Sequence, residues 1–99
     1  MSYKPKTMLT VLIYDISDNS KRTRVYKLLK RYAAPIQKSA FEGRLSRRER
    51  EAIMRLVGRN MDAESDRFVM YTIGSDQEKS IKVIGTPRPQ HPAQGFFII

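Results

Sequence analysis

An α+β fold in a single domain is what this sequence predicts, and three observations support that prediction. Two runs rich in β-branched and aromatic residues, at about 8–14 and 67–73, have strand composition. Two further segments carry apolar residues at helical spacing. The length of 99 residues suits one two-layer core, small enough that a partner subunit would help to cover its faces.

The first strand is expected at about Met8–Tyr14, after a short polar lead. Its β-branched, leucine and aromatic residues suit a central strand that is covered on at least one face. Asp15 follows directly. A carboxylate at the end of a buried strand either begins a turn or is presented to a ligand, and the strand alone leaves both interpretations open.

A first helix is expected after the polar residues 17–20, which offer several N-caps. The apolar stripe of this helix consists of Val25, Leu28, Leu29 and Tyr32. Its first turn carries Lys21, Arg22 and Arg24, although the peptide dipoles disfavour each cation there by about 0.3 to 1 kcal/mol. One interpretation is that an anion such as phosphate binds nearby. The other is that these long side chains lean into water.

Pro35 prevents the helix from continuing, and residues 36–43 predict a second strand that includes a turn, with a bulge as an option. Ser46 and Glu49 form a capping-box pattern at the start of a second helix, which Gly58 or Asn60 would end. The buried stripe of that helix consists of Ile53, Leu56 and Val57, with Ala52 and Met61 near its edge.

The run Arg67–Ile73 predicts a third strand, and Ser80–Ile84 a fourth. The expected elements run strand, helix, strand, helix, strand, strand, which fits no doubly wound sheet. They favour a ferredoxin-like βαββαβ two-layer sandwich with an antiparallel sheet, over residues 1–86, if the second strand pairs with the third across the intervening helix. Residues 87–99 form a proline-rich C-terminal tail that ends in the apolar run Phe96–Ile99. We expect that run to add an extra edge strand to the sheet of this chain, of a second copy or of another protein. An exposed, disordered tail is the alternative.

Composition limits the possible functions. With 19 Lys plus Arg against 10 Asp plus Glu, the net charge is +9, which points to a polyanionic partner such as nucleic acid. The absence of cysteine excludes disulfides and thiol catalysis. No apolar run is long enough to span a membrane and the N-terminus lacks a signal-peptide core, so a cytoplasmic protein is expected. His91, the single histidine, has no acidic neighbour and is not expected to act as a general base.

Four stretches together resemble the small CRISPR-associated adaptation proteins of the Cas2 family. They are Val11-Leu-Ile-Tyr-Asp-Ile-Ser-Asp18, Arg22-Thr-Arg-Val25, Ile36-Gln-Lys-Ser-Ala-Phe-Glu-Gly43 with Leu45, and the hydrophobic terminus. The combination of the first stretch with the next two carries the resemblance. Ala33-Ala34 and Pro35 depart from the family pattern in the loop after the first helix.

The resemblance implies a ferredoxin-like homodimer that works with the integrase subunit in spacer acquisition, and metal-dependent endonuclease activity on RNA or DNA. By matching motif, Asp15 would be the metal-binding acid at the dimer axis. Tyr14, Arg22, Arg24 and Phe41 correspond to positions linked with nuclease activity or nucleic-acid contact. The implied catalytic set is therefore Asp15, Tyr14 and Phe41.

Two hypotheses of different kinds follow. In the first, the protein is a structural DNA-binding dimer whose tail contacts the integrase. Its phosphate contacts would be Lys21, Arg22, Arg24, Arg31, Arg44, Arg47 and Arg48. In the second, it is a nuclease in which two copies of Asp15 share one Mg²⁺. A toxin-type ribonuclease of the same fold also stays open. An RNA-binding module is disfavoured, because Phe68 and Tyr71 would lie on opposite faces of one strand.

Overall fold

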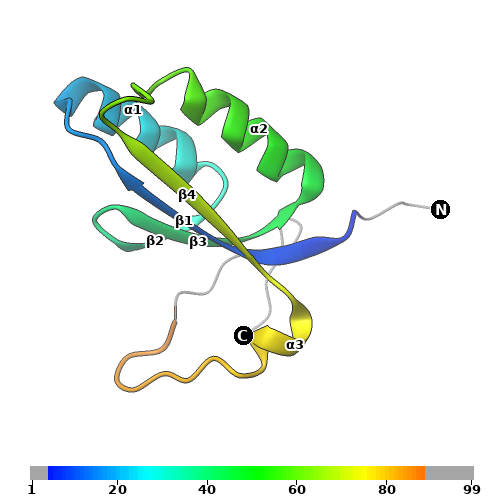
Figure 1. The fold of residues 1–99 in the computed structure, drawn as a ribbon. Coiled ribbons are helices and arrows are strands. Elements are labelled where there is room, and N and C mark those ends of the chain that lie inside the picture. The colour runs from blue at the N-terminus through cyan, green and yellow to red at the C-terminus, as the bar shows by residue number, and fades with distance from the viewer. Residues whose placement is uncertain (1–4, 89–99) are drawn as a thin grey trace.

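The computed structural model describes residues 5–88, so the expected C-terminal edge strand with Phe96–Ile99, and His91, lie outside the described residues. The elements run strand-helix-strand-strand-helix-strand, which is the βαββαβ order of the predicted fold class, and end in a single-turn helix (Figure 1). They are β1 Thr7–Asp15, α1 Asn19–Lys30, β2 Ala34–Gln37, β3 Ala40–Ser46, α2 Arg47–Gly58, β4 Arg67–Ile73 and α3 Ser75–Glu78.

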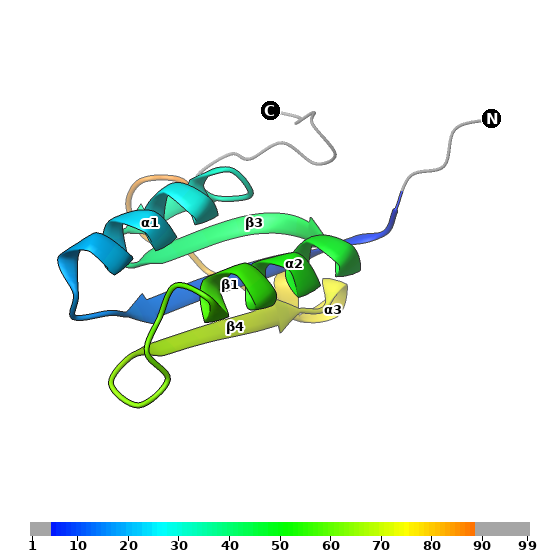
Figure 2. The ribbon, with the colours of Figure 1, turned by 90° about the horizontal axis from the view of Figure 1, so that it is seen from above.

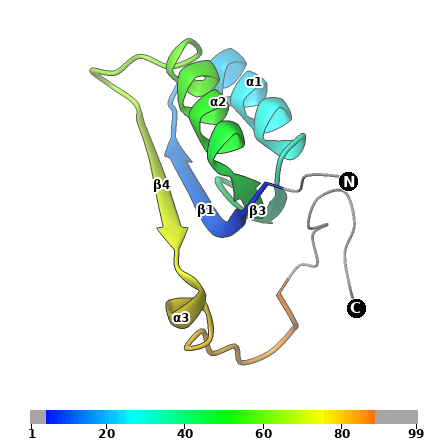
Figure 3. The same cartoon turned by 90° about the vertical axis from the view of Figure 1, so that its right-hand side faces the viewer.

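The four strands form one antiparallel sheet in the order β2-β3-β1-β4. This arrangement confirms the ferredoxin-like prediction. Helices α1 and α2 lie side by side over one face, which we call the helix face (Figures 1 and 2). The other face, called here the open face, has α3 and the segment that follows it on its side of the molecule (Figure 3).

β1 is the central strand, because β3 and β4 both pair with it along almost its whole length. Alternate residues of a strand point to opposite faces, so Leu12 and Tyr14 face the helices while Ile13 and Asp15 face the open side. The core lies between the sheet and the helices. It consists of Leu12, Tyr14, Ile16, Val25, Leu28, Leu29, Phe41, Leu45, Ile53 and Val57.

Local sequence signals explain where both long helices start. The Asp18 carboxylate accepts a hydrogen bond from the backbone N–H of Lys21 at 2.9 Å, which makes Asp18 the N-cap of α1. Ser46 and Glu49 form the complete capping box of α2, as the sequence predicts. α2 ends at Gly58, one of the two ends expected.

Two strand predictions need correction. The single second strand expected over residues 36–43 is a hairpin of two strands, β2 and β3, whose register shifts between Pro35 and Gln37. The fourth strand expected at Ser80–Ile84 is wrong, since that segment has no regular structure. The backbone N–H groups of Ser80 and Ile81 instead close the turn of α3, by donating to carbonyls one turn earlier, and Ile84 is fully exposed. An alternating apolar pattern does not make a strand where no neighbouring strand supplies hydrogen bonds.

Within residues 5–88, no helix is both long and apolar enough to cross a membrane. This finding agrees with the absence of a long apolar run in the sequence.

The contact between β3 and the end of α1 gives a stability prediction. A Cβ added at Gly43 would lie 2.9 Å from the Cβ of Ala33 and 3.1 Å from the carbonyl oxygen of Tyr32. Gly43→Ala should therefore lower the free energy of unfolding by about 1 to 3 kcal/mol, measured by urea denaturation.

Gly58 is the matched control, because an added Cβ there meets no atom within 4 Å. Gly58→Ala should leave stability unchanged or raise it by up to about 1 kcal/mol. Equal effects of the two substitutions would show that β3 and the end of α1 are not packed this closely.

Candidate functional site

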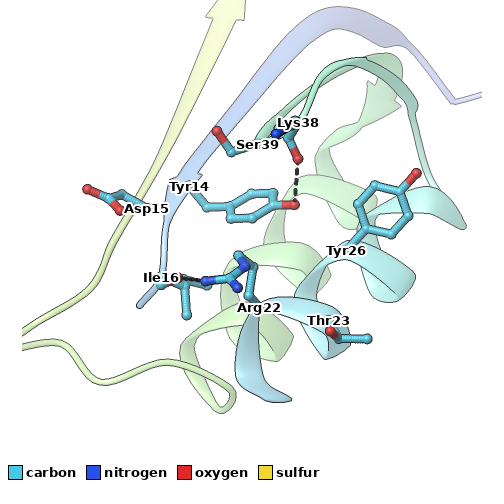
Figure 4. Close-up of a pocket in the computed structure, with 8 residues that line it drawn as sticks. All are labelled: Tyr14, Asp15, Ile16, Arg22, Thr23, Tyr26, Lys38 and Ser39. Atoms are coloured by element: carbon cyan, nitrogen blue, oxygen red, sulfur yellow. Dashed lines mark hydrogen bonds between the residues drawn. The ribbon is translucent and has the colours of Figure 1, made fainter. Parts of the chain in front are cut away.

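The end of β1 presents two neighbouring side chains to opposite sides of the sheet. Tyr14 is buried, with 3% of its surface exposed, whereas Asp15 is exposed and points away from Tyr14 (Figure 4). Asp15 pairs in register with Arg67 at the start of β4, so both side chains belong to the open face. The Asp15 carboxylate is thus available to a ligand, and a cation stands on the adjacent strand.

A pocket of about 500 Å³ opens beside this strand end. Three elements line it: the end of β1, the first two turns of α1 and the β2–β3 turn (Figure 4). The lining residues are Tyr14, Asp15, Ile16, Arg22, Thr23, Tyr26, Lys38 and Ser39. Three of the residues expected to be functional, Tyr14, Asp15 and Arg22, therefore meet at one site.

An aromatic cluster fixes the floor of the pocket. The Tyr14 ring stacks against Phe41 with centroids 6.4 Å apart, and the Tyr26 ring meets Phe41 edge-on at 5.3 Å. The Tyr14 hydroxyl donates to the Lys38 carbonyl oxygen at 3.2 Å. Phe41 is fully buried, so in this chain it supports the two tyrosines from behind and is not exposed to a substrate.

The Tyr14 hydroxyl is held in its neutral form. Burial raises its pKa, and the neighbouring Tyr26 raises it further, while the Arg22 guanidinium opposes both effects. A neutral phenol donates a hydrogen bond to Lys38 at physiological pH, which ties β1 to the β2–β3 turn.

Arg22 is held in place by the loop that follows β1. Its Nη1 donates to the carbonyl oxygens of Ile16 at 2.9 Å and Ser17 at 3.3 Å, and its Nη2 contacts the side-chain oxygen of Asn19. These bonds partly explain why a cation is tolerated at the start of α1. Of the two interpretations offered by the sequence, the side chain leaning freely into water does not describe Arg22.

A second loop also fixes the residues next to Asp15. The Asp66 carboxylate, just before β4, accepts bonds from the backbone N–H of Ser17 at 3.3 Å and of Asp62 at 2.8 Å. These bonds, led by the one from Asp62, lower the pKa of Asp66. The loop after β1 is therefore linked to the loop before β4.

The other cations expected to contact nucleic acid lie at both ends of the molecule. Lys21 and Arg24 accompany Arg22 in the first turns of α1, and Arg31 is at the far end of that helix. Arg47 and Arg48 begin α2, next to the strand end at Thr7, which is about 26 Å from Asp15 along β1. Arg48 and its neighbours line a second cavity of about 800 Å³, formed by Pro5, Lys6, Met8, Ser46, Arg47, Arg48 and Arg50.

Within the described part of the chain, two of the expected contacts are ion-paired, Arg47 with Glu51 on the exposed surface and Arg44 in a more buried position. The exposed Arg47 pair is the weaker of the two. Arg44 forms a two-pronged ion pair with Glu78 of α3, in which Nη1 and Oε1 lie 3.1 Å apart. The hydrogen bond to Glu78 raises the pKa of Arg44. An arginine committed to a carboxylate in this way is a weaker candidate for phosphate contact.

The described residues of one chain supply too few ligands for a divalent cation. Among residues 5–88, no three acidic, histidine or cysteine side chains come together. Asp15 offers one carboxylate, whereas Mg²⁺ needs six oxygen ligands, several of which are commonly water. One copy of the chain therefore does not fit the ion without further ligands.

The open face beside Asp15 is apolar. Ile13 is 39% exposed and Tyr71 is 55% exposed. Val69 pairs directly with Ile13 and precedes Tyr71 by two residues on the same face of β4. Exposed apolar residues that adjoin one another on a sheet commonly mark an interaction surface.

Comparison with known proteins now adds to this geometry. Residues 8–81 match the family model described as CRISPR associated protein Cas2. A CRISPR-associated endoribonuclease Cas2 from Chloroflexus aurantiacus is 31% identical over 96 residues, which cover 93% of this chain and all of the relative. The chain belongs to the Cas2 family.

Solved structures share the fold of this chain. The crystal structure of a hypothetical protein, TT1823, from Thermus thermophilus is similar, with a TM-score of 0.73, 30% identity and coverage of 85% of this chain and 99% of that one. A chain in a partial Cas6-RT-Cas1–Cas2 complex has a TM-score of 0.66 at 21% identity, covering 87% of this chain and 95% of its own length. At that identity the second likeness concerns the fold alone.

Sequence reasoning missed several residues of this Cas2 site. Tyr26 lies one helical turn after Arg22, a spacing that places both on one side of α1. Lys38 and Ser39 were missed because the sequence predicts a single strand over residues 36–43, whereas they form the turn between β2 and β3. Arg67 could have been found by pairing the end of β1 with the start of β4 as antiparallel neighbours.

The Asp66 bonds predict a pH-dependent stability. Because the folded pKa of Asp66 is lowered, its ionised form stabilises the fold above the ordinary aspartate pKa of about 3.9, and that contribution is lost as pH falls through the lowered value. Asp66→Asn should therefore unfold at a lower temperature than wild type at pH 7, and the difference should shrink below about pH 4.

Thermal unfolding followed by circular dichroism from pH 7 to pH 2 measures this difference. Glu64→Gln, which removes a neighbouring exposed carboxylate, is the matched control and should show no such convergence. A constant gap between wild type and Asp66→Asn across the whole range would contradict the role given to the Asp66 carboxylate.

Proposed function

We propose that this Cas2 chain is a homodimeric, nucleic-acid-binding subunit of CRISPR spacer acquisition that works with an integrase subunit, and that it has Mg²⁺-dependent endonuclease activity. The observation that carries the proposal is the placement of an exposed Asp15 beside the cations of α1, at the open end of β1, in a chain of this family. Each part of the proposal has its own physical support.

The apolar open face supports the homodimer. The pair Ile13 and Val69 follows the pair Asp15 and Arg67 on the open face, and Tyr71 comes next along β4. A two-fold axis through this region would bury these apolar side chains and bring two copies of Asp15 close together. A small domain with this much apolar surface outside its core gains stability from such burial.

The distribution of cations supports nucleic-acid binding. Lys21, Arg22 and Arg24 cluster at one end, and Arg47 and Arg48 lie at the other end, a separation suited to several phosphates of one backbone. Contacts of this kind depend on charge and not on sequence, and they weaken steeply with added salt. Arg44 contributes less, because Glu78 already neutralises it.

Two copies of Asp15 would give Mg²⁺ two carboxylate ligands and leave room for water. When bound, the ion would polarise the scissile phosphate and lower the pKa of a water. The chain itself holds the Asp15 carboxylate at the strand end. Arg67, which pairs in register with Asp15, and Arg22, which lines the same pocket as Asp15, can balance negative charge on a phosphate. Tyr14 and Phe41 position the strand end, and neither needs to touch the reacting atoms.

The integrase contact is proposed because the chain belongs to the Cas2 family. A chain of the same fold is part of the partial Cas6-RT-Cas1–Cas2 complex. The apolar run Phe96–Ile99 stays our candidate for this contact, and it lies outside the described residues. An apolar terminal segment can add a strand to a partner sheet.

Two variants separate the two activities. Asp15→Asn should lower Mg²⁺-dependent cleavage of RNA or DNA by about a hundredfold or more, since it removes a metal ligand, while duplex affinity in EDTA stays within about twofold.

Arg24→Ala should weaken duplex binding and reduce the slope of log K against log salt concentration by about 0.9, because one phosphate contact is lost.

Arg55→Ala, which removes an exposed arginine of α2 outside the proposed contacts, controls for net charge and should leave that slope unchanged. Fluorescence anisotropy at several salt concentrations and gel-based cleavage assays supply the two measurements. If the Asp15→Asn variant cleaves at the wild-type rate, the nuclease proposal is contradicted. If Arg24→Ala and Arg55→Ala have equal salt slopes, the binding proposal is contradicted.

A further inference from the structure

The pocket beside β1 offers more chemistry than a metal-dependent nuclease requires. The proposed metal ligand, Asp15, stands at its rim and points away from its interior (Figure 4). The interior is lined by Tyr26, Thr23 and the Lys38-Ser39 turn, none of which has a part in the proposed cleavage. Its volume of about 500 Å³ is within the range of small-ligand sites.

One side of the pocket carries Arg22, whose guanidinium can bind an anion. Arginine has five N–H donors, and the described bonds to Ile16, Ser17 and Asn19 use three of those on Arg22. Within residues 5–88, two donors of a guanidinium whose position is already fixed are left for a ligand. A fixed guanidinium binds a phosphate without the entropy cost of ordering a mobile side chain.

The other side of the pocket carries Tyr26, an aromatic ring on which a nucleobase can stack. Tyr26 is half-buried and its ring packs at 61° against Phe41. The Lys30 amino nitrogen lies over the Tyr26 ring, 5.9 Å from its centroid. Figure 4 shows the Tyr26 ring and the Arg22 guanidinium on either side of the same hollow. An aromatic ring and an adjacent cation together form the usual platform for a nucleobase and its phosphate.

We propose that this pocket binds one unpaired nucleotide of the nucleic acid held by the protein. The phosphate lies on Arg22 and the base stacks on Tyr26. The Ser39 hydroxyl lines the same pocket and can bond the base edge or sugar, whereas the Thr23 hydroxyl donates to the Asn19 carbonyl oxygen and can only accept from the nucleotide. The inference rests on the proposed nucleic-acid binding and deepens it. Bases inside a duplex are stacked and paired, so only a single strand or an opened end can enter.

The position of the pocket has a consequence for cleavage. A nucleotide bound there brings the adjoining phosphate of its strand to the pocket rim, where Asp15 stands. Tyr26 and Arg22 therefore select which phosphodiester approaches Asp15, and Tyr26 acts as a specificity residue.

The test uses two DNA probes in EDTA, so that no cleavage occurs. One is a thymidine single strand that carries a single 2-aminopurine, and the other is a blunt duplex with 2-aminopurine at its centre. Anisotropy measures binding, and quenching of 2-aminopurine reports stacking on an aromatic side chain. Wild type should quench the single-stranded probe and leave the central base of the duplex unaffected.

Tyr26→Leu should abolish the quenching and lower the ratio of single-strand to duplex affinity by about tenfold, whereas Tyr26→Phe should retain both. Thr23→Leu, which fills the pocket from an exposed helix position, should give the same loss without touching the aromatic cluster. Tyr32→Leu is the matched control, since Tyr32 is a half-buried tyrosine outside the pocket, and it should behave as wild type.

The outcomes separate this inference from the function on which it rests. If wild type binds both probes with salt sensitivity but Tyr26→Leu and Thr23→Leu keep the affinity ratio and the quenching, the pocket assignment is wrong and the binding function stands. If wild type binds neither probe, both the proposed function and the pocket assignment fail.

Discussion

The pairing of β1 on both of its edges is the constraint on which the rest of the structure depends. With β3 and β4 both in register, the strand cannot rotate or slip by one residue without moving its apolar side chains to the wrong face. That register sends Tyr14 to the helix face and Asp15 to the open face. The core and the candidate site are thus fixed by the same hydrogen bonds.

From this strand end, the site is assembled by groups that are also structural. Phe41 supports Tyr14 and Tyr26, and Arg22 bonds to carbonyl groups of the loop that follows Asp15. Substituting any of these residues alters the shape of the site as well as its chemistry. Asp15 and Arg67 are different, because they are exposed and contribute charge without supporting the core.

Features encoded within a few neighbouring residues could be predicted from the sequence. The strand Arg67–Ile73, both helix starts and the position of Asp15 follow from local patterning and capping. Features that depend on distant partners could not. The hairpin of β2 and β3 depends on pairing in space, the strand expected at Ser80–Ile84 has no partner, and the neighbour of Asp15, Arg67, comes from a strand 52 residues later.

We propose that one chain supplies half of a site, which a second copy completes at Asp15. The sequence contains no cysteine, so Asp15→Cys and Met54→Cys each introduce a single thiol, the second on the exposed surface of α2. Treatment with a short bismaleimide should link two Asp15→Cys chains rapidly, because the proposed two-fold axis would place these positions together, and should link Met54→Cys chains slowly. Equal rates for the two variants, or an Asp15→Cys protein that stays uncrosslinked, would contradict the shared site.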